Sequence, residues 1–384
     1  MIIARTAPRF YPEVTGPGKQ VYHISRGLQQ LGYTSQIYTT TPIGRSTPSD
    51  ISLDGLDVTR LPLSFSLMQF DVAIKFPVII LKSDFDMLHV HGYRDYLGTV
   101  AFAASQFRRR PFILQPHGSL LAYKALVPAS QWAPYQLYDD TTRRLIALKA
   151  DRVVVATDQE RREAIEYGVS PQRVRIIPPG TLLTKESKRN RSDMVRFLFV
   201  GRISPSRNVD LILRAFSMID RTQSARLNIV GGEAVLSSAE KRGYLSSVID
   251  LAKRLNFSNQ VSFTGPLFGH SLEEMYANSD VFVYASNYES FGQPILEAAS
   301  HGLPIISTPT GVAREIVQPG RTGTLFEFGD VDALASALTS YVVNRDKIEE
   351  MGRELRSMVL SSYQWDTILT KYKALYEEVM GSCP

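Results

Sequence analysis

Two glutamates, Glu289 and Glu297, stand eight positions apart in the stretch NYESFGQPILEAASHG. Between them lies the turn Ser290-Phe291-Gly292, which leads into an apolar run. We expect a helix from Gly292 onward with Ser290 as its N-cap, so that main-chain N–H groups point out of the turn at the positive end of the helix dipole. Such a turn can bind phosphate, while the two carboxylates accept hydrogen bonds from hydroxyls. The alternative is that both glutamates are surface charges on a capped helix.

A second group of residues that could take part in chemistry lies in VGRISPSRNVDLILRAF, where Arg202 and Arg207 flank a Ser-Pro-Ser loop. The loop separates a predicted strand from a predicted helix. A guanidinium group binds phosphate through a planar pair of donors, so two of them can neutralise a departing diphosphate. Taken singly, each arginine is more typical of a solvated loop.

Strand-like and helix-like runs alternate along the whole chain, which predicts a parallel α/β architecture. The run at 18–33 has apolar residues at three- and four-residue steps and predicts an amphipathic helix ended by Gly32. Several strand candidates are nearly continuous in Val, Ile, Leu and Phe, as in strands buried on both faces. The candidates are 85–92, 111–118, 151–158, 195–201, 225–232, 260–265, 280–286, 303–308 and 322–327.

The length of 384 residues exceeds one ordinary core and predicts two domains. We expect Rossmann-like domains over 1–185 and 186–362, joined by the polar, aperiodic linker 181–193. The closing segment, 363–384, predicts a long amphipathic helix that crosses back to the N-terminal domain. Because ligands of open α/β sheets bind beyond the carboxyl ends of the strands, we expect the site in a crevice between the two domains.

The composition narrows the class of protein. Hydrophobic residues make up 44% of the chain and charged residues 21%, as in soluble globular proteins. The single cysteine allows no intrachain disulfide and fits a reducing compartment. No apolar run of signal-peptide length opens the chain, and the apolar stretch 67–82 is interrupted by Asp71, Lys75 and Pro77. We therefore expect a cytoplasmic protein without a transmembrane anchor.

Positive charge is concentrated in the first half, where residues 1–185 contain 22 Lys and Arg against 15 Asp and Glu. This excess can attract the half to anionic lipid head groups, although it is also typical of a solvated surface. The densest basic cluster, FRRRPF at 107–112, is more typical of a solvated helix end. Nucleic-acid binding is not predicted, because no interleaving of aromatic and basic residues occurs.

An apolar surface at residues 62–82 would suit a lipid-linked acceptor. Together with the basic excess, it gives the hypothesis of peripheral association with the inner face of a membrane. A buried helix is the alternative interpretation of the same residues. The apolar side chains concerned are Phe65, Leu67, Met68, Phe70, Val72, Ile74 and Phe76.

The order of these motifs resembles family 4 of the retaining glycosyltransferases with a GT-B fold, a family marked by two glutamates eight residues apart in an E-S-F-G…E-A context. The resemblance runs nearly from end to end and implies two Rossmann-like domains that face a central crevice. It is carried by GPG at 16–18, QPHGSL at 115–120, RIIPPGT at 175–181, VGRISPSR, LNIVGGE and TPTGVAREIVQPGRTGTLF.

The resemblance also implies roles for individual residues. Glu289 would contact the transferred sugar and Glu297 the ribose of the nucleotide. Arg202 and Arg207 would bind the diphosphate, and His117 would lie beside the reacting carbon or an outer hydroxyl of the sugar.

The rest of the implied donor-binding set belongs to glycine-bearing turns, namely Gly16, Gly18, Gly231, Ser290, Phe291 and Gly292. Three positions depart from the family pattern. Arg207 replaces the usual lysine, Asn208 replaces a glycine, and Pro17 removes an N–H from the first loop. His89 and His91 are expected to be structural.

The implied reaction is the transfer of a hexose from a UDP- or GDP-sugar to a hydroxyl of a glycan or lipid-linked glycan, with retention and without a metal. Two D-x-D patterns, Asp84–Asp86 and Asp330–Asp332, are predicted to be turn and cap residues rather than metal ligands. Two alternatives stay open, a sugar-nucleotide epimerase or hydrolase of the same fold and a non-catalytic sugar-nucleotide-binding subunit.

Overall fold

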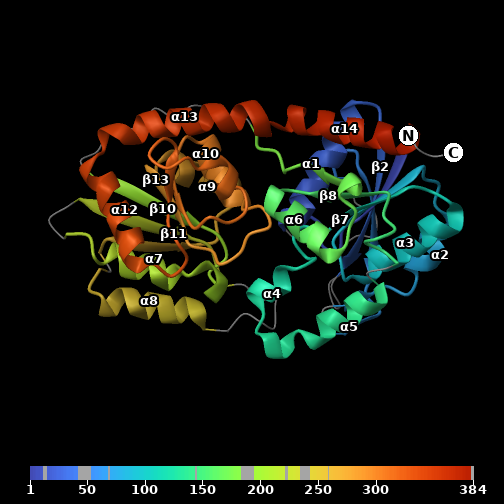
Figure 1. Ribbon diagram of the computed structural model, residues 1–384, viewed down its shortest axis with the longest axis horizontal. Helices are drawn as coiled ribbons and strands as arrows, with labels where there is room; N and C mark the ends of the chain where they lie inside the picture. Colours follow the sequence, from blue (N-terminus) through green and yellow to red (C-terminus); the bar gives the residue numbers. More distant parts are fainter. Residues whose placement is uncertain are drawn as a thin grey trace. The chain divides into compact units, whose positions relative to one another are not determined.

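The computed structural model divides into two compact units, each with its own parallel sheet (Figure 1). Unit 1 comprises Met1–Gly180 and Trp365–Pro384, and unit 2 comprises Thr181–Gln364. The predicted linker, 181–193, lies outside the described residues except for its first two. The structure describes residues 1–11, 15–41, 53–67, 70–142, 145–182, 194–220, 224–233, 243–257 and 259–381.

Unit 1 is built on a parallel sheet in the order β3-β2-β1-β6-β7-β8-β9. Its strands are β1 (Ile2–Thr6), β2 (Thr34–Thr41), β3 (Asp57–Pro62), β6 (Met87–His91), β7 (Phe112–Gln115), β8 (Arg152–Val155) and β9 (Val174–Ile176). A separate antiparallel pair consists of β4 (Phe65–Leu67) and β5 (Phe70–Val72). The helices are α1 (Gly16–Gln30), α2 (Phe76–Lys82), α3 (Tyr96–Arg108), α4 (Ala122–Leu126), α5 (Ala133–Thr142), α6 (Asp158–Tyr167) and α14 (Trp365–Gly381), with short 3-10 turns η1 (Ala129–Gln131) and η2 (Pro171–Arg173).

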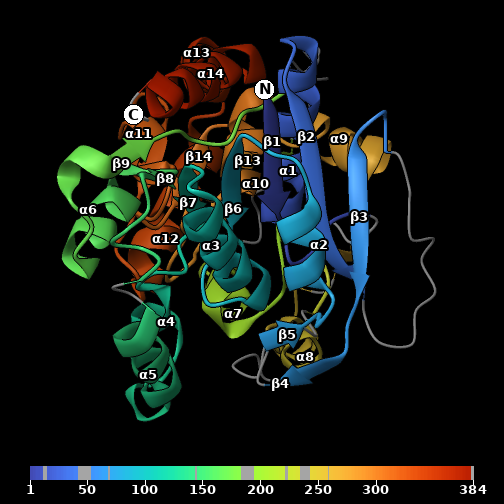
Figure 2. The same ribbon diagram turned by 90° about the vertical axis from the view of Figure 1, so that its right-hand side faces the viewer.

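The two faces of this sheet pack against different helices because side chains alternate along each strand. Ile3 and Met87 face α1 and α14 in one buried cluster. Ala4 and Leu88, one residue further along, belong to the opposite cluster with α3. On that second side α2 and α3 lie side by side (Figure 2).

Unit 2 repeats the design with a parallel sheet in the order β12-β11-β10-β13-β14-β15. Its strands are β10 (Val195–Val200), β11 (Ala225–Val230), β12 (Val261–Gly265), β13 (Val281–Tyr284), β14 (Ile305–Ser307) and β15 (Gly323–Leu325). The helical segments are η3 (Pro205–Arg207), α7 (Val209–Phe216), α8 (Tyr244–Arg254), α9 (Gly269–Ala277), α10 (Gln293–Ser300), α11 (Ala313–Ile316), α12 (Val331–Val343) and α13 (Asp346–Tyr363). The predicted α/β class is thus confirmed in both units.

Each sheet has one point where the strand order reverses. In unit 1 the chain runs outward through β1, β2 and β3 and then restarts at β6, on the other side of β1. In unit 2 it runs through β10, β11 and β12 and restarts at β13, beside β10. Loops on the two sides of such a reversal diverge and leave room for a ligand at the carboxyl ends of the strands.

Both interpretations of the apolar segment 62–82, an exposed surface and a buried helix, need correction. The segment 62–82 is neither one surface nor one helix, since it forms β4, β5 and α2. Val72 and Phe76 are buried core residues, whereas Phe65 and Ile74 are exposed. Met68 and the side chain of Leu67 lie outside what the structure describes.

Candidate functional site

The loops after β10 and β13 lie at the reversal point of the unit 2 sheet and contain most of the predicted donor-binding residues. Hydrogen bonds join the two loops. The Asn208 amide donates to the carbonyl of Ala285 at 2.7 Å, and the main-chain N–H of Asn287 donates to the carbonyl of Ser206 at 3.0 Å. The site therefore rests on two loops that hold each other in place.

Arg207 and Glu289 form an ion pair across these loops, with Nη1 and Oε1 2.9 Å apart. Both side chains are largely buried, with 12% and 10% of their surfaces exposed. Arg207 Nη1 also donates to Ser286 Oγ at 2.8 Å, and the guanidinium carbon lies 5.8 Å from the centroid of the Tyr284 ring. A cation and an anion are thus held together where little water screens them.

Tyr284 ends β13 beneath this pair and was not among the predicted site residues. Burial raises the pKa of its hydroxyl, and Glu289 raises that pKa further by its charge and by a hydrogen bond, while the charges of Arg207 and Arg202 lower it. The hydroxyl therefore stays protonated and donates to the Glu289 carboxylate.

Helix α10 begins one turn after Glu289, and its N-cap is Gly292 rather than Ser290. Gly292 has a φ of +90°, a left-handed conformation in which glycine costs least. The prediction of Ser290 as the cap is therefore wrong, because the chain enters the helix through a backbone turn that a serine would strain. The expected feature itself, a helix N-terminus beside Glu289, is present.

Gly311 is a second residue that the sequence did not single out. A Cβ on Gly311 would lie 2.3 Å from the carbonyl oxygen of Phe291 and 2.8 Å from Cβ of Glu289. The neighbouring N–H of Val312 donates to the same Phe291 carbonyl at 2.6 Å. The loop after β14 thus packs directly on the Glu289 loop, and only a glycine leaves enough room.

Glu297 lies within α10 and is partly buried. Its Oε2 accepts a hydrogen bond of 3.0 Å from the hydroxyl of Tyr276 on α9. Tyr276 is itself fully buried and stacks on His301, with ring centroids 5.0 Å apart. Burial, reinforced by the charge of Glu297, raises the pKa of Tyr276 well above its usual range, so the phenol remains a donor that orients this carboxylate.

The two remaining predicted residues of unit 2 lie at the ends of β10 and β11. Arg202 is exposed, and its positive charge lowers the pKa of the Tyr284 hydroxyl. Gly231 has a φ of +145°, and a Cβ there would lie 1.8 Å from the carbonyl oxygen of Gly201. Gly231 therefore allows the two strand ends to approach each other closely.

In unit 1, His117 follows β7 and has a φ of +51°, an unusual conformation for a histidine. Its Nε2 lies 3.2 Å from Nδ1 of His91, and the two rings stack with centroids 5.4 Å apart. Burial lowers the pKa of His117 to about 3. The imidazole is therefore neutral at physiological pH.

His91 continues into a buried polar chain. Its ring lies 4.2 Å from that of His89, and Nδ1 of His89 is 2.9 Å from Nη1 of Arg5 and 2.8 Å from the hydroxyl of Tyr376. His89 and His91 are fully buried, in agreement with their predicted structural role. Burial lowers the pKa of both histidines, and the charge of Arg5 lowers that of His89 further, so two neutral imidazoles lie between Arg5 and His117.

Gly16 and Gly18 form the first turn of α1 instead of a loop. Thr15 caps the helix by accepting a hydrogen bond from the N–H of Gly18 at 3.1 Å. Pro17 lies in the first turn, where main-chain N–H groups have no acceptor within the helix, so proline is tolerated there. A Cβ on Gly18 would lie 2.9 Å from the carbonyl oxygen of Arg9, so this glycine is required by close packing.

The two D-x-D patterns have ordinary structural partners. Asp330 caps α12 by accepting from the N–H of Ala333 at 2.8 Å, as predicted. Asp86 accepts from the N–H of Ile2 at 2.8 Å. Among the described residues, no group of three or more His, Cys, Asp and Glu side chains has an arrangement that could hold a metal ion. The same part of the chain contains no helix with the length and apolarity required to cross a membrane.

Family models and relatives agree with this architecture. Residues 183–358 match the family described as glycosyl transferases group 1, and residues 15–180 match a glycosyl transferase 4-like domain. The D-inositol 3-phosphate glycosyltransferase of Nocardia farcinica is 26% identical over 417 residues, which cover 100% of this chain and 90% of that protein. Its counterpart from Geodermatophilus obscurus is 29% identical over 406 residues, covering 96% of this chain and 86% of the relative.

Solved structures share the fold over the full length. Sucrose-phosphate synthase from Thermosynechococcus elongatus has a TM-score of 0.81 at 21% identity and covers 99% of both chains. The Anabaena protein HepE, solved in complex with UDP and glucose, has a TM-score of 0.79 at 16% identity, covering 98% of this chain and 100% of its own. The predicted GT-B fold is confirmed by these likenesses.

Proposed function

Because the chain belongs to the glycosyl transferases group 1 family and is a transferase, we propose that it moves a hexose from a UDP- or GDP-sugar to an acceptor hydroxyl with retention at the anomeric carbon. The observation that carries this proposal is the buried pair of Arg207 and Glu289 beside the start of α10, at the reversal point of the unit 2 sheet. A nucleotide sugar needs cationic groups for its diphosphate and carboxylates for its hydroxyls, and this site offers both.

The roles follow from chemistry. Breaking the bond between the sugar and the diphosphate leaves positive charge on the sugar and negative charge on the leaving group. Arg202, Arg207 and the main-chain N–H groups at Phe291 and Gly292 stabilise that negative charge. With these groups in place no metal is required for the leaving group.

The two glutamates bind different parts of the donor. Glu289, held by Arg207 and Tyr284, faces the transferred sugar, and Glu297, oriented by Tyr276, accepts from the ribose. Ser290 completes the turn, and Gly231 leaves room at the ends of β10 and β11.

Unit 1 supplies the acceptor side in this proposal. His117 is neutral and acts as a hydrogen-bonding group near the reacting carbon. Gly16 and Gly18 add no side chains at the start of α1. The acceptor is a hydroxyl of a glycan or lipid-linked glycan, and UDP is supported as the nucleotide by the complexes of HepE with UDP and with UDP-glucose.

The experiment compares two variants with a control. Glu297→Ala should weaken UDP or GDP binding roughly tenfold, the value of one charge-assisted hydrogen bond. Glu289→Gln should leave nucleotide affinity unchanged but lower turnover by roughly a hundredfold, because the carboxylate acts on the transition state. Glu274→Ala, which removes an exposed carboxylate of α9, should change neither quantity.

Titration calorimetry with UDP and GDP gives the affinities, and release of nucleotide from the sugar donor gives the turnover. Undiminished turnover in Glu289→Gln would refute the assigned role. A parallel assay in EDTA should retain full activity. Loss of activity that a divalent ion restores would contradict the metal-independent mechanism.

We also propose peripheral association of unit 1 with an anionic membrane surface through α2 and α3 (Figure 2). Phe107 is 81% exposed and Ile74 is 63% exposed, and Val78 and Leu81 are exposed on α2. Exposed Lys75, Lys82 and Arg109 belong to the same two helices and their flanks. Apolar side chains among lysine and arginine suit a lipid interface.

Co-sedimentation with phosphatidylglycerol vesicles at low salt tests this membrane contact. Val78→Ser combined with Leu81→Ser should release the protein, whereas Phe328→Ser, which removes an exposed apolar residue of unit 2, should not. The absence of wild-type binding would dispose of the proposal.

A further inference from the structure

Unit 1 contains a cavity of about 260 Å³ that is lined by side chains of α4, α5 and α6 and the residue before α4. This volume lies just below the roughly 300 Å³ at which pockets for drug-sized ligands begin, so it suits one small ring. The lining residues are Leu121, Tyr123, Lys124, Gln136, Asp139, Asp140, Glu166 and Tyr167. None of them belongs to the donor site of unit 2.

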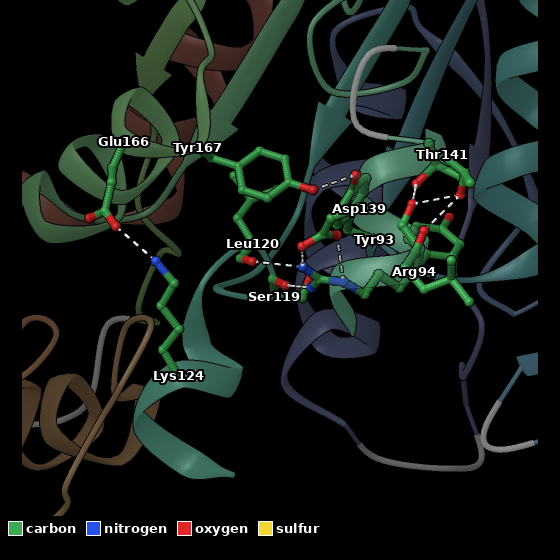
Figure 3. Close-up of polar contacts among 12 residues, drawn as sticks. Tyr93, Arg94, Ser119, Leu120, Lys124, Asp139, Thr141, Glu166 and Tyr167 are labelled. Atoms are coloured by element: carbon green, nitrogen blue, oxygen red, sulfur yellow. Dashed lines mark hydrogen bonds and ion pairs between the residues drawn. The ribbon is translucent and has the colours of Figure 1, made fainter. Parts of the chain in front are cut away.

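Arg94, which follows β6 at the reversal point of the unit 1 sheet, binds Asp139 of the cavity lining, and each of its guanidinium nitrogens donates a hydrogen bond (Figure 3). Nε and Nη2 donate to the two carboxylate oxygens of Asp139 at 2.9 and 2.6 Å. Nη2 also donates to the carbonyl of Leu120 at 2.8 Å, and Nη1 donates to that of Ser119. All three nitrogens of the Arg94 guanidinium group therefore donate to acceptors within unit 1.

Aromatic rings form a rigid wall beside this arginine. Tyr123 and Tyr135 stack almost parallel, with centroids 4.9 Å apart, and the Arg94 guanidinium carbon lies 5.1 and 5.7 Å from their centroids. Tyr167 forms a hydrogen bond with Asp139. Its hydroxyl also lies 2.9 Å from the hydroxyl of Tyr93 (Figure 3). Tyr123 and Tyr167 of this group also line the cavity, so part of its wall is aromatic and is held in place by these contacts.

The charge of the lining is acidic. Asp139, Asp140 and Glu166 contribute three carboxylates, against two cationic groups, the Lys124 ammonium in the lining and the Arg94 guanidinium paired with Asp139. Lys124 is itself paired with Glu166, with Nζ and Oε1 2.9 Å apart, and the two side chains point toward each other from α4 and α6 (Figure 3). Carboxylates accept hydrogen bonds from hydroxyls but repel phosphate.

We propose that this cavity binds an uncharged, hydroxyl-rich ring, a sugar or cyclitol unit of the acceptor, and rejects the phosphorylated form of the same ring. The inference rests on the proposed transfer to an acceptor hydroxyl and names the chemical class of that acceptor. The curated relatives described above are named for D-inositol 3-phosphate, so this chain would differ from them in the charge of its acceptor.

The test is saturation-transfer NMR on the full-length protein with matched neutral and phosphorylated rings. The probes are methyl α-glucoside, methyl α-mannoside, methyl α-galactoside and myo-inositol, with glucose 6-phosphate and inositol 3-phosphate as the charged members. All samples contain UDP, so that the donor site is occupied. The variants are Asp140→Asn combined with Glu166→Gln, and the control is Glu163→Gln, a carboxylate of the same helix that does not line the cavity.

We expect a saturation-transfer signal from at least one neutral ring. The double variant should lose most of that signal, and the control variant should keep it. The phosphorylated rings should give weaker signals than their neutral partners. Stronger binding of the phosphorylated rings, or neutral binding that the double variant leaves intact, or no binding at all, would overturn the inference. UDP affinity is measured in the same samples, so a failure of the donor site is recognised separately. Thermal midpoints confirm that the exposed substitutions leave the fold intact.

Discussion

The position of Arg207 shows how the site fixes a flexible side chain. Its Nη1 donates to Ser286 Oγ at 2.8 Å and to the carbonyl of Tyr288 at 3.3 Å, and lies 2.9 Å from Oε1 of Glu289 in an ion pair. A guanidinium group oriented in this way presents its charge without a further loss of side-chain entropy when a diphosphate binds. The arginine found at the usual lysine position is therefore compatible with a donor site.

At the same scale, His91 is predicted to position His117 through the contact of 3.2 Å between their ring nitrogens. His91→Asn should lower the turnover number at least roughly tenfold while leaving nucleotide affinity unchanged, because only the orientation of His117 is lost. Steady-state kinetics and titration with UDP separate the two quantities. His270→Asn, at an exposed histidine of unit 2, is the control. Normal turnover of His91→Asn, with impaired turnover of His117→Asn, would exclude the positioning role.

The pH dependence of turnover follows from the same group. The pKa of His117 is lowered to about 3, so its imidazole is neutral from pH 5 to 8 in the folded protein. His117 should therefore contribute no titration step to the pH profile of turnover in that range.

At the scale of elements, the loop after β14 is predicted to depend on Gly311. Gly311→Ala places a methyl group 2.3 Å from the Phe291 carbonyl and should reduce the free energy of unfolding of unit 2 by more than about 2 kcal/mol. Gly320→Ala is the matched control, because Gly320 also has a positive φ but nothing lies within 4 Å of its added Cβ. It should cost about 1 kcal/mol. If calorimetry gave equal losses of unfolding free energy for the two variants, the contact between Gly311 and Phe291 would not contribute to stability.

Element by element, the sequence predicted best where a strand is buried on both faces. Runs such as 195–201 and 280–286 are continuously apolar and correspond to β10 and β13. The strand β2 was not predicted, since its sequence TSQIYTTT is rich in threonine and its burial comes from packing in the sheet.

The site was predictable to a similar degree. The motifs placed Glu289 and Arg207 each on a loop after a predicted strand, and in the structure Nη1 of Arg207 and Oε1 of Glu289 lie 2.9 Å apart. The contributions of Tyr284 and Gly311 could not be read in advance, because they arise when loops distant in the sequence pack together. The cap at Gly292 was missed because a left-handed glycine replaces the usual side-chain cap.

At the scale of the whole molecule, Glu160 is predicted to make stability depend on pH. This carboxyl group accepts from the N–H of Ala156 at 2.6 Å, and burial raises its pKa to about 8. The folded protein therefore holds a proton that the unfolded chain releases between about pH 4.5 and pH 8, so stability falls as pH rises through this interval.

Glu160→Gln removes this titration and should become more stable relative to the wild type as the pH increases from 5 to 8. Both tryptophans of the chain, Trp132 and Trp365, belong to unit 1, so denaturation followed by tryptophan fluorescence reports on the unit that contains Glu160. A constant difference between variant and wild type across this range would contradict the prediction.

The most direct measurement of the central claim is a crystal structure of the protein with UDP or GDP. The claim predicts the diphosphate within hydrogen-bonding distance of the Arg202 and Arg207 side chains and the main-chain N–H groups at the start of α10, with the ribose on Glu297. A nucleotide bound anywhere else on the chain would contradict it.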